Sequence, residues 1–162
     1  GHIPNNPTLP MLLYPNAIDL STNPSDPATL FERLFAQNGW TGGCWRNGIY
    51  PFPHYHSTAH EVLGIAAGHA EVRLGGQTGQ VFTVKAGDVA LLPAGCGHQN
   101  LGASSDLLVV GAYPPGPDWD LCRGEPGERP SAIENIAKVP LPATDPVGGT
   151  QGPVIEHWLN QD

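Results

Sequence analysis

Apolar and polar residues alternate along the middle of the chain. Ala70, Val72 and Leu74 alternate with charged or polar residues, and the Gly75-Gly76 pair that follows is typical of a turn. Similar short apolar runs, bounded by Gly, Pro, Asn or Ser, occupy residues 81–85, 89–92 and 107–112. Several short strands at such spacing predict a sandwich or a barrel.

A helical period precedes these strands. Two Leu and two Phe residues recur at helical spacing between positions 30 and 35. Asp26 followed by Pro27 is a typical helix start, because Asp caps free N–H groups and Pro suits the first turn. Asn38-Gly39 is a typical stop. We predict a short amphipathic helix over 27–37 that packs on the outside of the core.

Segments without a regular period flank the predicted strands. Residues 1–26 are rich in Pro and Asn, so we predict an extended arm. Residues 116–162 are rich in Pro, Gly and acidic residues, with one or two helical turns predicted at 131–138. This C-terminal arm still carries apolar residues such as Val154 and Trp158. We therefore expect it to wrap the core or to exchange with a partner subunit.

These segments together predict one domain over residues 1–162. Its core of strands is placed at about 40–115, with the N-terminal arm and helix at 1–39 and the C-terminal arm at 116–162. A chain of 162 residues, 40% of them apolar, can bury a sizeable core without disulfides or metal. The 21 glycines and 18 prolines favour short strands and tight turns, so we expect an all-β fold.

Charge and cysteine content limit the partners and the compartment. The 15 acidic and 7 basic residues give a formal net charge of −8, which argues against nucleic acid and anionic membranes, because both need a basic patch. Three widely spaced cysteines do not predict a disulfide framework. We recognise neither a signal peptide nor a long apolar span. We predict a cytoplasmic protein whose partner is a small molecule.

Metal-binding residue types gather in the stretch from Gly48 to Gly68. His54 and His56 stand two residues apart, and such positions on a strand point to the same face. Both imidazoles can therefore reach one ion. Glu61 follows after a short turn, and we expect it to return on the neighbouring strand as an anionic ligand.

A second stretch runs from Gly87 through Pro93 and Gly95 to His98. The strand predicted at 89–92 leads into a tight turn, after which His98 opens the next strand. Closure of the strands into a barrel would bring His98 beside the two earlier histidines.

Together the two stretches resemble the two motifs of the cupin superfamily. The first resembles Gly-x5-His-x-His-x4-Glu-x6-Gly at every defined position. The second resembles Gly-x5-Pro-x-Gly-x2-His, with Gly102 in place of the usual turn Asn. The whole chain is similar to an uncharacterised group of bacterial single-domain cupins. The resemblance implies a double-stranded β-helix, the cupin jelly-roll barrel, with the metal ligands His54, His56, Glu61 and His98.

Three imidazoles and one carboxylate suit one divalent transition-metal ion. Fe, Mn, Ni, Co and Zn all fit this donor set, and the residues do not choose among them. An octahedral ion would keep two positions for water, O₂ or a chelating substrate, whereas a tetrahedral zinc would be filled. A degenerate cupin that holds no metal is the alternative.

Other residues near the motifs are candidates for catalysis or substrate binding. His60 neighbours Glu61 and could compete for the ion or act as an acid or base beside it; otherwise it is a surface histidine or one that lies behind the ligands. The candidates for substrate binding lie beside the first motif or where the barrel ends, and packing of the arm is the other interpretation for each. They are Arg46, Tyr50, Tyr113 and Trp119.

The resemblance implies a metal-dependent enzyme acting on a small polar molecule, because cupins with this pattern include dioxygenases, decarboxylases and isomerases. The alternative is a non-catalytic module that senses or sequesters a small molecule or the metal. A metal-free, epimerase-like cupin with His as a base is a third possibility. Many cupins are dimers and long arms suit packing across a two-fold axis, so we predict a homodimer.

Overall fold

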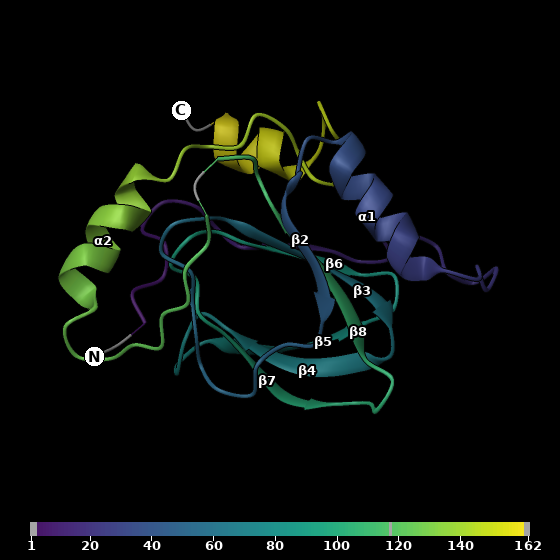
Figure 1. The fold of residues 1–162 in the computed structure, drawn as a ribbon, viewed down its shortest axis with the longest axis horizontal. Helices are drawn as coiled ribbons and strands as arrows, with labels where there is room; N and C mark the ends of the chain where they lie inside the picture. The colour runs from purple at the N-terminus through teal and green to yellow at the C-terminus, as the bar shows by residue number, and fades with distance from the viewer. Residues whose placement is uncertain (1–2, 117, 161–162) are drawn as a thin grey trace.

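Two antiparallel β-sheets frame the protein (Figure 1). The structure is a computed structural model and describes residues 3–116 and 118–160. The larger sheet has the strand order β1-β6-β3-β8-β2, and the smaller sheet has the order β5-β4-β7. The strands span Leu12–Tyr14 (β1), Gly42–Asn47 (β2), Glu61–Ala67 (β3), His69–Leu74 (β4), Gln80–Lys85 (β5), Val89–Leu92 (β6), His98–Ala103 (β7) and Leu108–Tyr113 (β8).

This architecture confirms the all-β jelly-roll fold predicted from the sequence. Strands β4, β5, β6 and β8 begin and end within a residue of their predicted ranges. Within the described ranges, the strand ladders remain in two sheets and do not close into one barrel. Strand β1 lies in the segment predicted as an extended arm, and it forms an edge of the larger sheet by pairing with β6, where Leu12 lies opposite Leu91.

The predicted helix is confirmed as α1, Pro27–Gln37. The Asp26 side chain accepts the backbone N–H of Thr29 at 3.2 Å and so caps the first turn. Phe31 faces the larger sheet, where β3 carries Gly64. A Cβ at Gly64 would lie 2.4 Å from the Phe31 ring, so this glycine lets the helix pack closely on the strand.

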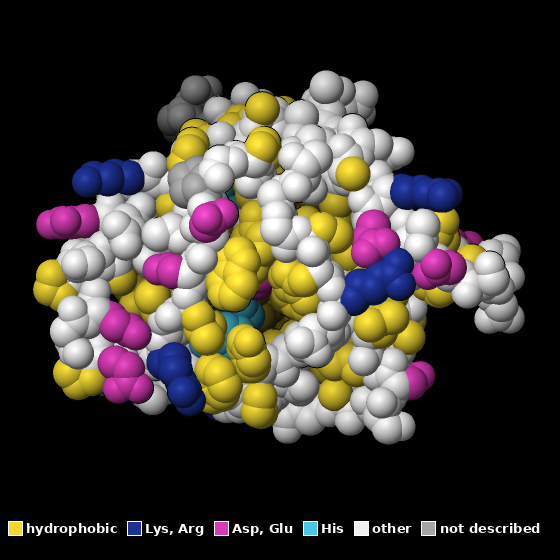
Figure 2. Space-filling model, in the orientation of Figure 1, with side chains coloured by type: hydrophobic (Ala, Val, Ile, Leu, Met, Phe, Trp, Pro, Cys, Tyr) yellow, Lys and Arg dark blue, Asp and Glu magenta, His cyan; other side chains and the backbone are white. Residues whose placement is uncertain are grey.

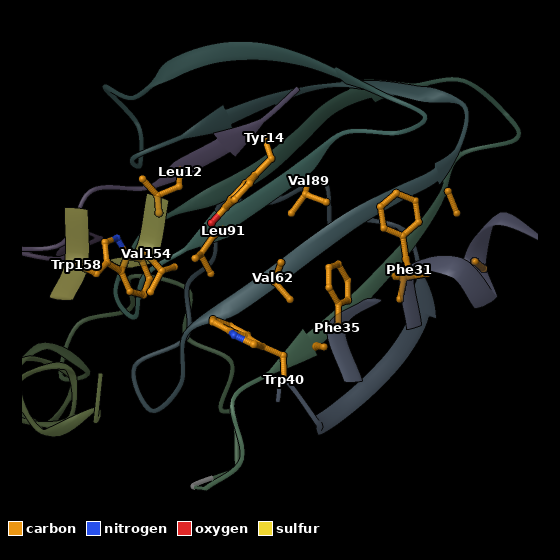
Figure 3. Close-up of a cluster of buried hydrophobic side chains, with 14 residues drawn as sticks. Leu12, Tyr14, Phe31, Phe35, Trp40, Val62, Val89, Leu91, Val154 and Trp158 are labelled. Carbon is orange, nitrogen blue, oxygen red and sulfur yellow. The ribbon is translucent and has the colours of Figure 1, made fainter. Parts of the chain in front are cut away.

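Buried side chains form two layers, one on each face of the larger sheet. Along β3, Val62 and Ala66 point outward, whereas Leu63 and Ile65 point between the sheets. The outer layer joins β1, β6 and β8 to α1 and to the C-terminal segment (Figure 3). Because β3 is buried on both faces, its residues form a continuous apolar run rather than an alternating one.

The C-terminal arm contains two helices. Helix α2 spans Arg129–Lys138, which confirms the helical turns predicted there, and a π-helix, η1, spans Val154–Leu159. Trp158 of η1 is buried in the outer layer of the chain's own larger sheet. The buried Asp145 carboxylate fastens the arm, because it accepts the Tyr14 hydroxyl at 2.8 Å and three backbone N–H groups. No helix in the described part of the chain is long and apolar enough to cross a membrane.

Candidate metal centre

Strand ends and one extended segment bring His54, His56, Glu61 and His98 together. Glu61 is the first residue of β3, and His98 is the first residue of β7. His54 lies in a segment beside β7, where it exchanges two backbone hydrogen bonds of 3.1 and 2.8 Å with His98. All four side chains are buried. One potential ligand atom from each of the three histidines lies within 4.8 Å of the other two.

Each of these histidines places its Nδ1 atom against a backbone carbonyl. A carbonyl oxygen only accepts, so Nδ1 carries a hydrogen, and in the neutral imidazole Nε2 then keeps its lone pair. A hydrogen bond of this kind orients metal-binding histidines in proteins. The pairs are His54 with Phe52 (2.9 Å), His98 with Cys96 (3.1 Å) and His56 with Asp120.

Glu61 adds a carboxylate oxygen to the group. Its Oε1 atom lies 3.2 Å from Nε2 of His56 and 3.2 Å from Nε2 of His98. With the Nε2 atoms unprotonated, these contacts bring lone pairs together, and they become favourable when a cation stands among them. Nitrogen and oxygen donors of this kind suit divalent transition ions. The donor set therefore fits one such ion.

Burial and charge oppose each other at the centre. Burial, reinforced by His98, lowers the pKa of His54 to about 3, so this imidazole is neutral. Burial alone would raise the pKa of Glu61, but His56 and His98 outweigh it and hold that pKa below its usual range. Burial also opposes a charge on His56, yet Glu61 leaves the pKa of His56 raised. The centre thus attracts positive charge to the contact between His56 and Glu61.

A chain of hydrogen bonds leads from the larger sheet to Glu61. The Tyr113 hydroxyl donates to Oε2 of Glu61, and Nε1–H of Trp45 donates to the Tyr113 oxygen at 3.3 Å. Burial, reinforced by Glu61, raises the pKa of Tyr113, so the phenol keeps its proton and remains a donor. Tyr113 therefore occupies Oε2 and leaves Oε1 to face the histidines.

The loop 118–122 packs over the ligand segment. The Asp120 carboxylate accepts both the backbone N–H of Ser57, at 2.6 Å, and the Ser57 hydroxyl. Its backbone carbonyl holds His56, and the ring of Trp119 meets His56 edge-on with ring centroids 5.7 Å apart. This loop therefore fixes the orientation of one metal-ligand candidate.

A cavity of about 350 Å³ opens over the centre. In Figure 2 it is the hollow in the middle of the face, with histidine side chains at its base and hydrophobic side chains around it. Four aromatic and two aliphatic side chains line it beside the ligand candidates. They are Trp45, Tyr50, Tyr113, Trp119, Ile49 and Leu63.

The structure places all four residues that we predicted to bind substrate on the wall of this cavity. Tyr113 is buried, whereas Tyr50 and Trp119 are 46% and 45% exposed. Arg46 also lines the cavity, but its guanidinium makes two hydrogen bonds to the Glu32 carboxylate, of 2.9 and 2.7 Å. Arg46 is therefore engaged rather than available as an anchor for an anion.

His60 lies away from the centre. It is buried, its ring packs edge-on against Trp158 at 4.9 Å, and its Nδ1 accepts the backbone N–H of Ala94 at 2.9 Å. It faces the outer layer because neighbours on a strand point to opposite faces, and Glu61 points to the centre. It is not among the residues that line the cavity over the centre. We therefore assign His60 no part in the chemistry, in contrast to its predicted catalytic role.

Three residues of the site escape prediction from the sequence. Trp45 lines the cavity only because the face that β2 turns inward is set by its pairing with β8. Ser57 and Asp120 are joined across a separation of 63 residues, and neither lies in a recognisable motif. The strand around Trp45 reads Gly-Gly-Cys-Trp-Arg-Asn and does not alternate, so the sequence offers no signal for Trp45, Ser57 or Asp120.

A protein of Bacillus subtilis is similar to the chain along nearly its whole length. No family model matches the chain. The uncharacterized protein YjlB of Bacillus subtilis (strain 168) is 38% identical over 159 residues, which cover 98% of this chain and 92% of YjlB.

Two solved structures illustrate the more distant likeness. Acireductone dioxygenase from Bacillus anthracis, with a cadmium ion in its active centre, is 14% identical, with a TM-score of 0.45 over 67% of this chain and 80% of that one. A DUF861 family protein from Thermotoga maritima is 20% identical, with a TM-score of 0.35 over 51% of this chain and 89% of that one. At these levels the likeness carries no argument about activity.

Proposed function

The chain belongs to the cupin superfamily and to the same family as YjlB, and on that premise we propose that it is a metal-dependent enzyme acting on a small molecule. The residues proposed to hold one divalent transition ion are His54, His56, Glu61 and His98. One observation carries the proposal: three imidazoles with Nδ1 tied to carbonyls and one buried carboxylate converge beneath a cavity.

The remaining residues of the site have roles that follow from their contacts. Tyr113 holds Oε2 of Glu61, and the Asp120 carbonyl holds His56. Trp119 and Tyr50 stand at the cavity wall, where they would exclude water from a bound molecule. When bound, the ion would supply Lewis-acid polarisation of a carbonyl or activation of O₂.

Metal stoichiometry tests the binding part of the proposal. Protein stripped with a chelator is incubated with Fe²⁺ without air, or with Mn²⁺, Co²⁺, Ni²⁺ or Zn²⁺, and bound metal is measured after gel filtration. We expect one ion per chain in the wild type and little in His98→Ala. His69→Ala is the matched control, because His69 is an exposed histidine at the start of β4. Equal metal content in all three proteins would refute the proposed ligand set.

Turnover separates an enzyme from the alternative, a binding or sensing module. Metal-loaded wild type is screened against chelating small molecules for O₂ uptake and product formation. Turnover that disappears in His98→Ala supports the enzyme. Ligand-dependent thermal stabilisation without any turnover, across the panel and with every metal, supports the module instead.

A further inference from the structure

The part of the cavity wall that the structure describes provides aromatic surface but no unpaired cationic side chain. Among the described residues that line it, the charged side chains besides the histidines are Arg46 and Glu61. The Glu32 carboxylate accepts two hydrogen bonds from the guanidinium of Arg46, and Oδ1 of Asp26 lies 3.9 Å from Nη1 of the same guanidinium. A phosphate or a second carboxylate on a ligand would therefore find no unpaired positive partner on the wall.

The charges at the base of the cavity favour a ligand that carries one negative charge. Histidine binds a metal ion as neutral imidazole and a carboxylate binds it in the ionised form, so the proposed ligands His54, His56, His98 and Glu61 would together contribute one negative charge. A divalent ion held by this set would leave a net charge of about +1, which one monoanionic chelating group would balance. A dianionic group would leave an excess negative charge in a buried place, in a chain whose formal net charge is already −8.

Two half-exposed aromatic rings flank the histidines. Tyr50 stacks on Phe52 at 4.9 Å and meets His54 edge-on at 5.3 Å. Trp119 stacks on Tyr113 at 6.1 Å, with its own edge-on contact to His56. Each exposed ring is thus held in place by a second one, and each would gain burial from a planar apolar group in the cavity.

The size of the cavity limits the ligand. A volume of about 350 Å³ is near the lower end of small-molecule sites, which span about 300–1,000 Å³. Trp45 and Leu63 extend the apolar wall down to the ligand candidates. A single aromatic ring with a chelating group fits these dimensions better than a long or branched polar molecule.

We propose that this site takes a small aromatic molecule carrying one monoanionic pair of oxygen donors, and that Trp119 and Tyr50 recognise its ring. The inference rests on the proposed metal centre and deepens it by naming the ligand class. Phosphate esters and dicarboxylates are disfavoured, because Arg46, the arginine among the described residues of the wall, is already paired.

Two hydroxamates of equal chelating chemistry test the ring. Acetohydroxamate and benzohydroxamate both offer a monoanionic pair of oxygens, and only the second carries a ring. Their affinities for the Co²⁺-loaded protein are measured from the visible spectrum of the ion and by calorimetry, and are compared with their affinities for Co²⁺ in solution. We expect the protein to add a preference of about tenfold or more for benzohydroxamate.

Variants assign the preference to named residues. Trp119→Leu keeps apolar volume but removes the ring, so the preference for benzohydroxamate over acetohydroxamate should fall several-fold in the Co²⁺-loaded variant. Trp119→Phe should retain most of the preference for benzohydroxamate. Tyr50→Leu should reduce this preference as Trp119→Leu does. Ile133→Ala is the control, because Ile133 is exposed on α2 and outside the residues that line the cavity.

A third ligand tests the charge argument. Addition of a carboxylate to the far side of the ring, as in 4-carboxybenzohydroxamate, should give binding no tighter than that of benzohydroxamate. Tighter binding would overturn the exclusion of dianions.

The two proposals fail in different ways. Absence of Co²⁺ binding would remove the metal centre and this inference with it. Bound Co²⁺ together with no hydroxamate binding, or with no preference for the ring beyond that in solution, would overturn the ligand class and leave the metal centre standing.

Discussion

At the scale of single residues, backbone carbonyls and one phenol orient the proposed ligands. The carbonyl partners of the three histidines lie on segments far apart in sequence, at Phe52, Cys96 and Asp120. The Tyr113 hydroxyl orients Glu61 in the same way, because it donates a hydrogen bond to Oε2. Such partners fix the direction of the ligand lone pairs, so their loss should weaken metal binding without unfolding the protein.

Tyr113→Phe tests this positioning. It removes the hydroxyl that donates to Glu61 and keeps the ring that stacks on Trp119. We expect Co²⁺ affinity to fall by about 10–100-fold, measured by competition with a chelator. Tyr50→Phe is the control, since among the described residues the Tyr50 hydroxyl forms no hydrogen bond to a ligand candidate and the ring contact with His54 is kept. Unchanged affinity in Tyr113→Phe would show that Glu61 is oriented without the phenol.

At the scale of elements, helices and strands with a clear hydrophobic period were predictable from the sequence. Elements that form only through contacts with residues distant in sequence were not. Strand β4 alternates, and α1 has a start, a period and a stop, so both follow from the sequence. Strand β1 has three residues in a Pro-rich arm, too few to show a period, and its pairing with β6 creates it. Helix η1 has no cap from its own preceding residue, Pro153, and it is held instead by the distant Asp145 carboxylate and by the burial of Trp158.

The candidate site divides in the same way. Four ligand candidates were predictable because their spacing follows the strand period and a known motif. The aromatic wall was predictable in part, because Tyr50 and Trp119 lie near the motif edges. The Ser57–Asp120 contact and the ion pair between Arg46 and Glu32 could not be predicted from the sequence, since each depends on tertiary structure.

Gly64→Ala tests the contact between α1 and β3. The added methyl would lie 2.4 Å from the Phe31 ring, so the free energy of unfolding should fall by about 1–3 kcal/mol in urea titrations. Gly102→Ala is the matched control, because no heavy atom beyond its chain neighbours lies within 4 Å of a Cβ there. Equal stability of the two variants would mean that α1 does not pack as described.

Helix α2 begins at a carboxylate with a lowered pKa. Glu128 accepts the backbone N–H groups of Arg123 and Gly124, at 3.0 and 2.8 Å, and the Tyr55 hydroxyl at 3.1 Å. Burial alone would raise the pKa of Glu128, but these donors outweigh it and lower that pKa. Its stabilising effect is therefore complete above the pKa of an unfolded Glu, about 4.3, and is lost as the pH falls through the lower folded value.

Glu128→Gln checks this pH dependence. The wild type should exceed the variant in free energy of unfolding at pH 6, and the difference should shrink toward pH 3, as measured by urea unfolding. Glu134→Gln, an exposed position on the same helix, should show a small difference at both values. A gap between wild type and Glu128→Gln that does not depend on pH would contradict the role of this carboxylate.

At the scale of the whole molecule, β1 of the N-terminal arm and η1 of the C-terminal arm pack on the outer face of the larger sheet. Asp145 joins them, because its carboxylate accepts the Tyr14 hydroxyl of β1 and the backbone N–H of Val154 at the start of η1. The arms therefore contribute to the core of their own chain. The predicted homodimer remains a prediction, which light scattering at micromolar concentration can test.

Asp145→Asn tests the joint between the arms. An amide presents N–H groups where acceptors are needed, so buried donors lose their partners. We expect a loss of about 3 kcal/mol or more in the free energy of unfolding. Asp19→Asn, at an exposed turn, should stay within about 0.5 kcal/mol of wild type. If Asp145→Asn also lowered the free energy of unfolding by less than about 0.5 kcal/mol, the arms would be held mainly by Trp158 and its apolar neighbours.

The most direct measurement is an anomalous diffraction map from a crystal of the protein grown with Co²⁺. The account predicts one peak per chain, bonded to Nε2 of His54, His56 and His98 and to Oε1 of Glu61, with every Nδ1 still at its carbonyl. A peak bound through Nδ1, or Co²⁺ found elsewhere while these four side chains hold none, would contradict it.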